Sequence, residues 1–178
     1  MLSITALAGV PALVRRTFGE RVLHHANRAA MLDIELIEDR DCFIPHATIT
    51  SFLAEIERRT GEIHLGLLIA PHLSLADYGC WGRYILEAET LGTAIARSIQ
   101  AIGYHSRGDR PGLSIEDDGA RLSYLSAARG RDGYAHVAAG TVGVMLSLCR
   151  SYLAANWRPA WIELDIPRPR QATPFEDA

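Results

Sequence analysis

The apolar residues of this chain change their spacing near residue 110, and this change limits the folds that the chain can adopt. Before this point they recur every three or four positions, which places them on one face of a helix. Examples are Ile49, Phe52, Leu53 and Ile56. In the segment 113–116 they alternate instead, which is the period of a strand. The sequence therefore predicts an α+β fold, with a helical N-terminal half followed by a small antiparallel sheet.

Helices are expected throughout the first hundred residues, and their ends carry recognisable signals. Gly19 and Gly61 suit the positions that end a helix, Pro71 stops one, and Thr90 offers an N-cap hydroxyl. The predicted helices cover 11–17, 20–30, 45–60, 63–70, 80–87 and 90–102, and Gly103 ends the last of them. An acidic connector is expected at 35–41. In the third helix, Glu55, Glu57, Arg58 and Arg59 are expected to face water.

The second half reads as a hairpin, a buried helix and a strand. Asp118-Gly119 is a dipeptide favoured in two-residue hairpin turns, and Leu122 and Tyr124 resume the alternation after it. The segment 134–156 is apolar nearly all round, so it predicts a helix packed deep against the sheet, ended by Pro159. The segment 161–166 alternates strictly and predicts a further strand, with Ile162, Leu164 and Ile166 facing inward.

Composition narrows the possible functions. The chain has 178 residues, of which 48% are hydrophobic, so it can bury one sizeable core, which we place in a single domain over 1–166. All 18 basic residues are arginine, which excludes Schiff-base and pyridoxal-phosphate chemistry and a Walker-type phosphate loop, because each needs a lysine. The net charge of −3 and the scattered arginines predict no DNA binding by this segment itself. With no membrane span and no leader in view, a cytoplasmic location is expected.

The seven histidines and three cysteines form no recognisable metal or catalytic motif. The adjacent pair His24 and His25 point about 100° apart on a helix, so the two cannot share a metal from one face. Gly140 and Gly143 fall inside a predicted helix rather than between a strand and a helix, so they indicate close helix packing and not a dinucleotide site. No catalytic residue, metal or cofactor is therefore expected.

The most informative stretch runs from Asp77 to Ile95. It resembles the pattern in the N-terminal domain of one large branch of AraC-type regulators, in which a glycine-rich helix precedes a Thr-Leu-Gly-x-Ala-Leu helix start. The matching residues are Gly79, Gly82, Thr90, Leu91, Gly92 and Ala94. The resemblance implies an effector-binding domain that senses a small molecule, forms a homodimer and acts in bacterial transcription regulation.

Two departures from this pattern concern single residues, and a third concerns a whole domain. Glu89 stands where the family often has proline, and Arg83 stands near a position that is usually aromatic. Nothing resembles the family's C-terminal domain with two helix-turn-helix units, through which contact with DNA is expected. We interpret 167–178 as a linker or tail towards such a domain, so the chain is either a piece of a longer regulator or a natural stand-alone sensor.

The aromatic residues and one arginine are the candidate ligand contacts. An effector pocket of this kind is expected to be mostly apolar with a few polar anchors. The candidates are Tyr78, Trp81, Arg83, Tyr84, Tyr104, Tyr134 and Trp161. Arg83 either pairs with an acidic group of the effector or is a surface arginine stacked on an aromatic ring.

Two rival functions stay open at this point. A ligand-free dimerisation module is favoured if the domain has a closed pocket without a polar anchor. A hydrolase or metal enzyme with a non-local site would show a histidine and a carboxylate within hydrogen-bond reach in a cleft.

Overall fold

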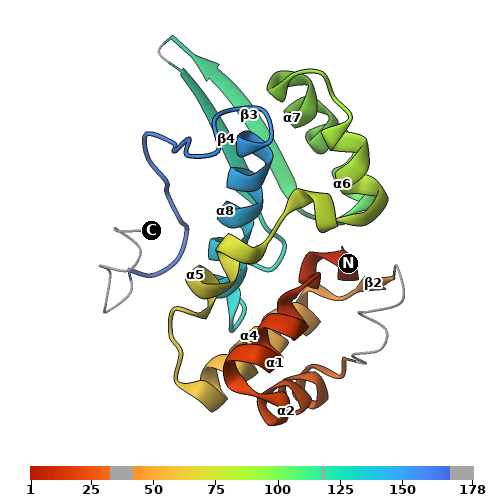
Figure 1. Ribbon diagram of the computed structural model, residues 1–178, viewed down its shortest axis with the longest axis vertical. Helices are drawn as coiled ribbons and strands as arrows, with labels where there is room; N and C mark the ends of the chain where they lie inside the picture. The colour runs from red at the N-terminus through yellow and green to blue at the C-terminus, as the bar shows by residue number, and fades with distance from the viewer. Residues whose placement is uncertain (33–41, 118, 169–178) are drawn as a thin grey trace.

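The computed structural model describes residues 1–32, 42–117 and 119–168 and has the predicted α+β architecture (Figure 1). A helical N-terminal lobe lies at one end of the elongated molecule, and a second lobe built around one long helix lies at the other. The N-terminal lobe contains α1 (Val10–Phe18), α2 (Glu20–Ala30) and α4 (His46–Thr60). These bounds agree closely with the predicted ones. The acidic connector predicted at 35–41 lies outside the described residues.

The core of the N-terminal lobe forms around α4, which packs against α2. Phe52 and Ile56 of this helix are fully buried, as is Leu23 of α2. Gly61 ends α4 in the left-handed conformation, with φ of 73°, as its position predicted. The expectation that all the charged residues of α4 face water is wrong for Glu55, which is 4% exposed. Its carboxylate accepts from Arg58 and Arg59, and these arginines cover it.

A two-stranded sheet that the sequence did not reveal joins the N-terminus to the rest of the molecule. β1 (Leu2–Ser3) pairs antiparallel with β2 (Phe43–Ile44). Two-residue strands are too short to show a period, so no pattern could have indicated them. The Ser3 N–H donates to the His105 carbonyl at 2.7 Å, which ties the segment before the hairpin to the N-terminal lobe.

The junction between the lobes depends on glycines that allow backbones to approach closely. α5 (Leu65–Ile69) and the 3₁₀ turn η2 (Ala70–His72) lie against α8 (Tyr134–Arg150). A Cβ atom at Gly143 would lie 2.4 Å from the Ala70 carbonyl oxygen, and one at Gly66 would lie 2.7 Å from the His136 Cα. The prediction that the glycines of α8 serve close packing is confirmed.

Two helices flank the hairpin on one side (Figure 1). The 3₁₀ turn η3 (Leu75–Asp77) leads into α6 (Gly79–Leu86), and α7 (Leu91–Gln100) leads into the 3₁₀ turn η4 (Ile102–Tyr104). The Thr90 hydroxyl accepts from the Thr93 N–H at 3.2 Å, so the predicted N-cap of α7 is confirmed. The Tyr152 hydroxyl, beyond the end of α8, lies 3.0 to 3.2 Å from three carbonyl oxygens at the end of α6.

The hairpin is present, but its turn lies one residue earlier than predicted. β3 (Arg110–Glu116) pairs with β4 (Gly119–Leu125), and the pair nearest the turn is Glu116 with Gly119. Gly119 therefore belongs to the strand β4. The sequence Asp117-Asp118-Gly119 offers the turn more than one register, and the pairing of the strands decides between them.

The strand predicted at 161–166 is absent. α8 ends at Arg150, earlier than the predicted residue 156, and the segment 157–166 then runs beside α8 in an extended, unpaired form. Leu164 and Ile166 pack against the small cluster around Tyr134, whereas Ile162 is 51% exposed. An extended segment that buries alternate side chains against a helix has the same period as a strand, so the pattern alone could not exclude this outcome. Of the predicted tail 167–178, residues 169–178 lie outside the described residues.

Candidate functional site

A cavity lies where the two lobes meet, and we call it the central cavity. Its lining residues come from segments spread along the chain, from Leu2 in β1 to Leu148 in α8. Its water-accessible volume is about 130 Å³, roughly ten times the ~10–15 Å³ that a single water molecule needs on this measure. The space is therefore large enough to hold more than isolated water molecules.

Most of the central cavity is lined by aliphatic side chains. Leu7 comes from the N-terminal 3₁₀ turn η1 (Ile4–Leu7), and Leu53 comes from α4. α8 supplies Val137 and Val144 from the opposite side, and Leu122 comes from β4. A ligand would bury apolar surface here at about 25 cal/mol per Å². The wall therefore favours a molecule that is largely apolar.

Three aromatic rings form a stack on one side of the cavity. The His105 ring stacks against both Tyr78 and Trp81, at centroid distances of 4.8 Å and 4.5 Å, and the Tyr78 and Trp81 centroids lie 6.3 Å apart. The three rings therefore form a compact group in which each lies next to the other two. Gly82 holds α6 close to the preceding turn, because a Cβ atom there would lie 2.0 Å from the Leu75 carbonyl oxygen. This approach fixes the start of α6, which carries Trp81.

Two polar groups of this stack are notable. Burial, with a smaller contribution from the Asp77 charge, raises the pKa of the Tyr78 phenol, which therefore stays protonated at neutral pH. The indole Nε1 of Trp81 is buried and finds no hydrogen-bond acceptor in the described part of the chain. A buried donor without an acceptor costs about 1–3 kcal/mol, so an oxygen atom beside it would be stabilising.

Asp109 is a buried carboxylate in the cavity wall, just before β3, and is 7% exposed. One oxygen accepts from the Tyr124 hydroxyl at 2.5 Å. The other accepts from the Ala127 N–H at 2.7 Å and from the Ser126 hydroxyl at 3.4 Å. Burial first, and then Asp109, raise the pKa of Tyr124 well above its ordinary value. All three groups that donate to this carboxylate are uncharged.

A histidine and a carboxylate do meet at the edge of the cavity. His136 Nε2 lies 2.8 Å from a Glu57 carboxylate oxygen. The Gly66 N–H donates to Nδ1 of the same ring at 3.3 Å, so the ring proton resides on Nε2 and is donated to Glu57. Both ring nitrogens are therefore engaged within the protein. The pair links α4, α5 and α8, and this geometry leaves neither nitrogen for a substrate proton.

A second, larger space lies on the other side of β4 and α8, and we call it the strap cleft because the segment 157–166, the C-terminal strap, borders it. Its water-accessible volume is about 570 Å³. Asp165 of the strap accepts from the Tyr134 hydroxyl and pairs with Arg129 at 2.8 Å. The Arg121 guanidinium lies 4.6 Å from the centre of the Trp161 ring, in a cation–π contact.

The two spaces share a wall. Both are lined by residues of β4, of the turn after it and of the middle of α8. The shared residues are Leu122, Ser123, Tyr124, Ser126, Thr141 and Met145. A shift of these side chains on one side of the wall can therefore alter the shape of the space on the other side.

The candidate residues named from the sequence divide into three groups. Tyr78 and Trp81 line the central cavity, and Tyr134 and Trp161 line the strap cleft. The other three residues line neither space: Arg83, Tyr84 and Tyr104.

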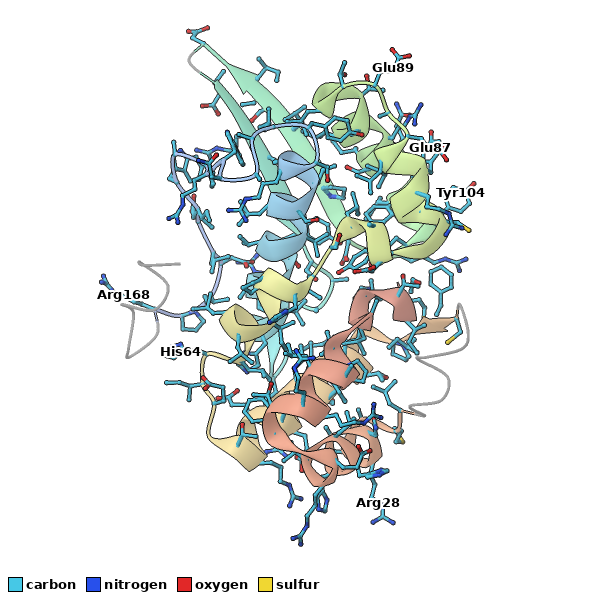
Figure 2. All side chains as sticks on the ribbon, viewed as in Figure 1. Arg28, His64, Glu87, Glu89, Tyr104 and Arg168 are labelled. Atoms are coloured by element: carbon cyan, nitrogen blue, oxygen red, sulfur yellow. The ribbon has the colours of Figure 1, made fainter. Side chains whose placement is uncertain are left out.

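The three residues outside both spaces lie on the molecular surface. Arg83 is exposed and donates to the Cys80 sulfur at 3.0 Å, so the burial that suggested an ion pair with a ligand is absent. Tyr84 lies beneath the Arg97 guanidinium, 5.0 Å from its ring centre. Tyr104 is 81% exposed and points outward in Figure 2.

Sequence reasoning missed His105 and Asp109, which supply the third ring of the stack and the buried carboxylate. His105 has no partner at helical spacing, and its ring contacts come from residues more than twenty positions earlier. Asp109 lies in a run of glycine, proline and arginine that indicates only a loop. One usable signal existed, because an aspartate directly before a strand often fixes a turn through its side chain.

A concave, mostly aliphatic space with a few fixed polar groups is the usual form of a small-molecule binding site. Residues 23–178 match the family described as the arabinose-binding domain of AraC transcription regulators, at their N-terminus. The match covers most of the chain, so the chain belongs to this family and is a ligand-sensing regulatory domain. The family is one of effector-binding domains and not of enzymes. A search of curated proteins finds no match to this chain.

Two further properties of the described residues bear on function. None of their helices has the length and apolar character needed to cross a bilayer. Their histidine, cysteine and acidic side chains form no group of three or more that could hold a metal ion.

Proposed function

We propose that the central cavity is the effector site of this regulatory domain. The observation that carries the proposal is one cavity that combines a mostly aliphatic wall with fixed polar groups, among them the Trp81 indole N–H and the Asp109 carboxylate. A cavity without polar groups would favour a domain that only dimerises. Fixed polar groups in an apolar wall orient a ligand and give specificity.

The arabinose in the family description is not carried over to this chain. A pentose presents several hydroxyl groups, and each one buried without a partner costs about 1–3 kcal/mol. The walls contributed by α4, α5 and the N-terminal turn are aliphatic, so most of these hydroxyls would lack partners. The cavity therefore supports an effector that is less polar than a sugar.

Two valines of α8 provide a matched test. Val144 lines the central cavity, Val142 lines the strap cleft, and both are half-buried. Native mass spectrometry of the purified protein should show the same bound small molecule in the wild type and in Val142→Phe, and none in Val144→Phe. A ligand retained by Val144→Phe, or lost only from Val142→Phe, would contradict the assignment of the site. Thermal melts of both variants check that each is folded.

Self-association is the second part of the proposal, and it is supported by the family. Ile115 near the hairpin tip is 76% exposed, and Leu113 on the same face is 36% exposed. The hairpin projects beyond α7 in Figure 1, where a second copy of the chain can reach this face. The same native spectra report the oligomeric state, and a monomer at high micromolar concentration would contradict this part.

Signal output is the third part. In a bacterial AraC-type regulator, the ligand state of this domain would be passed to a DNA-binding domain that follows it in the chain. A ligand shifts that equilibrium only by the difference between its affinities for the two arrangements, typically about 1–3 kcal/mol. The C-terminal strap, which borders the wall shared with the central cavity, is the connection we propose. Because this mode of action takes place inside the cell, we also propose a cytoplasmic location.

A further inference from the structure

We infer that the effector of the central cavity is an uncharged, largely apolar molecule bearing a hydroxyl or carbonyl oxygen, and that carboxylates and phosphates are excluded. This inference rests on the proposed effector site and deepens it by naming the chemical class of the ligand. Three observations carry it: the absence of lysine and arginine from the described wall, the three neutral donors on Asp109, and the unsatisfied Trp81 donor.

The described wall contains no lysine or arginine that could neutralise an anion. The chain has no lysine, and none of its arginines is among the described residues that line the central cavity. Arg97 and Arg107 are directed elsewhere, to the rings of Tyr84 and Phe43. An anion entering this space would lose its hydration without gaining a partner charge, and that loss is far larger than for a neutral polar group.

Asp109 adds a repulsion that acts on anions alone. Its buried carboxylate forms no ion pair with the described residues, so its negative charge is not offset beside the cavity. The histidine His136, which also lines the cavity, has both ring nitrogens engaged within the protein, by the Gly66 N–H and by Glu57, so it offers no free donor to an anion. A carboxylate or phosphate is therefore disfavoured twice, by desolvation and by a like charge.

A cation is disfavoured for a different reason. A carboxylate has about four acceptor positions, and three donors of the protein already occupy those of Asp109. An ammonium group has three protons to satisfy, and the remaining position accepts only one. The desolvation of the ammonium would therefore be only partly offset, whereas a hydroxyl needs no more than one acceptor.

The Trp81 indole N–H indicates which group the ligand should carry. Its buried Nε1–H has no acceptor among the described residues, although it belongs to a side chain of the cavity wall. An indole N–H donates only, so its partner must present an acceptor atom. A hydroxyl or carbonyl oxygen on an otherwise apolar molecule meets this need without bringing a charge.

The test compares ligands that differ only in charge. The ligands are built on two hydrocarbon frames, adamantyl and octyl, which do not absorb near 280 nm. Each frame is used as the alcohol, the carboxylate and the ammonium. The first set is 1-adamantanemethanol with its acid and amine counterparts, and the second is 1-octanol with octanoate and octylammonium. The chain contains three tryptophans, so the double variant Trp157→Phe, Trp161→Phe leaves Trp81 alone to report on the cavity. Fluorescence titration at pH 7 should show the alcohol binding at least tenfold more tightly than either charged counterpart. Equal or tighter binding of a carboxylate or an ammonium would overturn the inference.

Two acid-to-amide variants identify the source of the discrimination. Asp109→Asn keeps the size of the side chain and removes its charge, so the gap between alcohol and carboxylate should narrow at least threefold. Asp77→Asn removes a charge from an exposed residue outside the cavity lining and should leave the gap unchanged. An unchanged gap in Asp109→Asn would contradict the assigned role of Asp109. If that variant does not fold, the comparison of the alcohol with the carboxylate in the Trp81-only protein decides alone.

The proposed binding site and the proposed class of ligand can be disproved separately. If Val144→Phe, added to the Trp81-only protein, leaves the alcohol titration unchanged, the ligand does not occupy the central cavity and the proposed function fails. If Val144→Phe abolishes binding but a charged ligand is preferred in the unblocked protein, the site stands and the inference about charge is wrong.

Discussion

The central cavity and the strap cleft lie on opposite sides of one wall, yet they are built in different ways. The cavity is lined by elements from β1 to α8, and its acidic residue Asp109 is buried with three hydrogen bonds. The cleft is larger and is bordered by a strap without regular structure. The main ion pair of that strap, between Arg129 and Asp165, has side chains that are 60% and 36% exposed.

This difference separates the part of the molecule that must be folded from the part that can move. Opening the central cavity would require the lobes to separate, because its walls belong to the hydrophobic core. Releasing the strap would break few contacts, and exposed ion pairs contribute at most about 1 kcal/mol each. We therefore assign ligand binding to the rigid space and signal output to the strap.

The largest expected effect concerns Gly82, which follows the cavity residue Trp81 and lies against the Leu75 carbonyl. Gly82→Ala should lower the free energy of unfolding by about 3 kcal/mol or more, because a Cβ atom would lie 2.0 Å from the Leu75 carbonyl oxygen and the backbone must move. Urea denaturation measures this loss. Gly92→Ala in α7 is the control, since a Cβ there has nothing within 4 Å, and it should not destabilise the protein.

The next prediction compares the acidic residues of the two spaces directly. Asp109→Ala leaves the Ala127 N–H and the Tyr124 hydroxyl without acceptors, and it should cost about 2–3 kcal/mol. Asp165→Ala in the strap should cost less, about 1–2 kcal/mol, because it loses one hydrogen bond from Tyr134 and an ion pair with the exposed Arg129. Urea melts of both variants at one pH decide the order. Equal losses in the free energy of unfolding would contradict the view that the central cavity is part of the core and that the C-terminal strap is held more weakly.

A smaller effect is expected at alkaline pH from Tyr78. Its pKa is raised in the folded protein by burial, so the folded state holds the phenol proton more tightly than the unfolded state does. The stability from this group is fully present below pH 10 and falls as the pH rises above it, by about 1.4 kcal/mol per pH unit. Tyr78→Phe should therefore show a shallower loss of stability between pH 10 and 12.

The control for this prediction is Tyr104→Phe, a substitution at a side chain that is 81% exposed. Chemical denaturation at several pH values measures the slope for each variant. A slope in Tyr78→Phe equal to that of the wild type would indicate that the phenol is not buried in the cavity wall as described.

Local signals in the sequence were sufficient for the helices and the hairpin. Thr90 and Gly61 mark helix ends through interactions within a few residues, and these ends are confirmed. The strand at 161–166 failed because its period is shared by any extended segment that buries alternate side chains, here Leu164 and Ile166. The exposure of Glu55 was also wrong, since partners on its own helix, Arg58 and Arg59, allow it to be buried.

The candidate site could be found only in part. The family pattern pointed to the start of α6, and Tyr78 and Trp81 of that region do line the central cavity. His105 and Asp109 depend on contacts across the molecule, with the stacked rings on one side and the turn at Ala127 on the other. Such contacts leave no periodic trace in a single sequence. Arg83 was singled out because its charge was unusual for a small, apolar helix, but that helix exposes it.

The most direct test of the account is a crystal structure of the protein with the small molecule that it carries on purification. The account predicts that the ligand lies in the central cavity, with an uncharged oxygen accepting from Trp81 Nε1 and apolar groups against Val137 and Val144. The strap cleft should hold no part of it. A ligand found in the strap cleft, or an anionic group seated beside Asp109, would contradict the central claim.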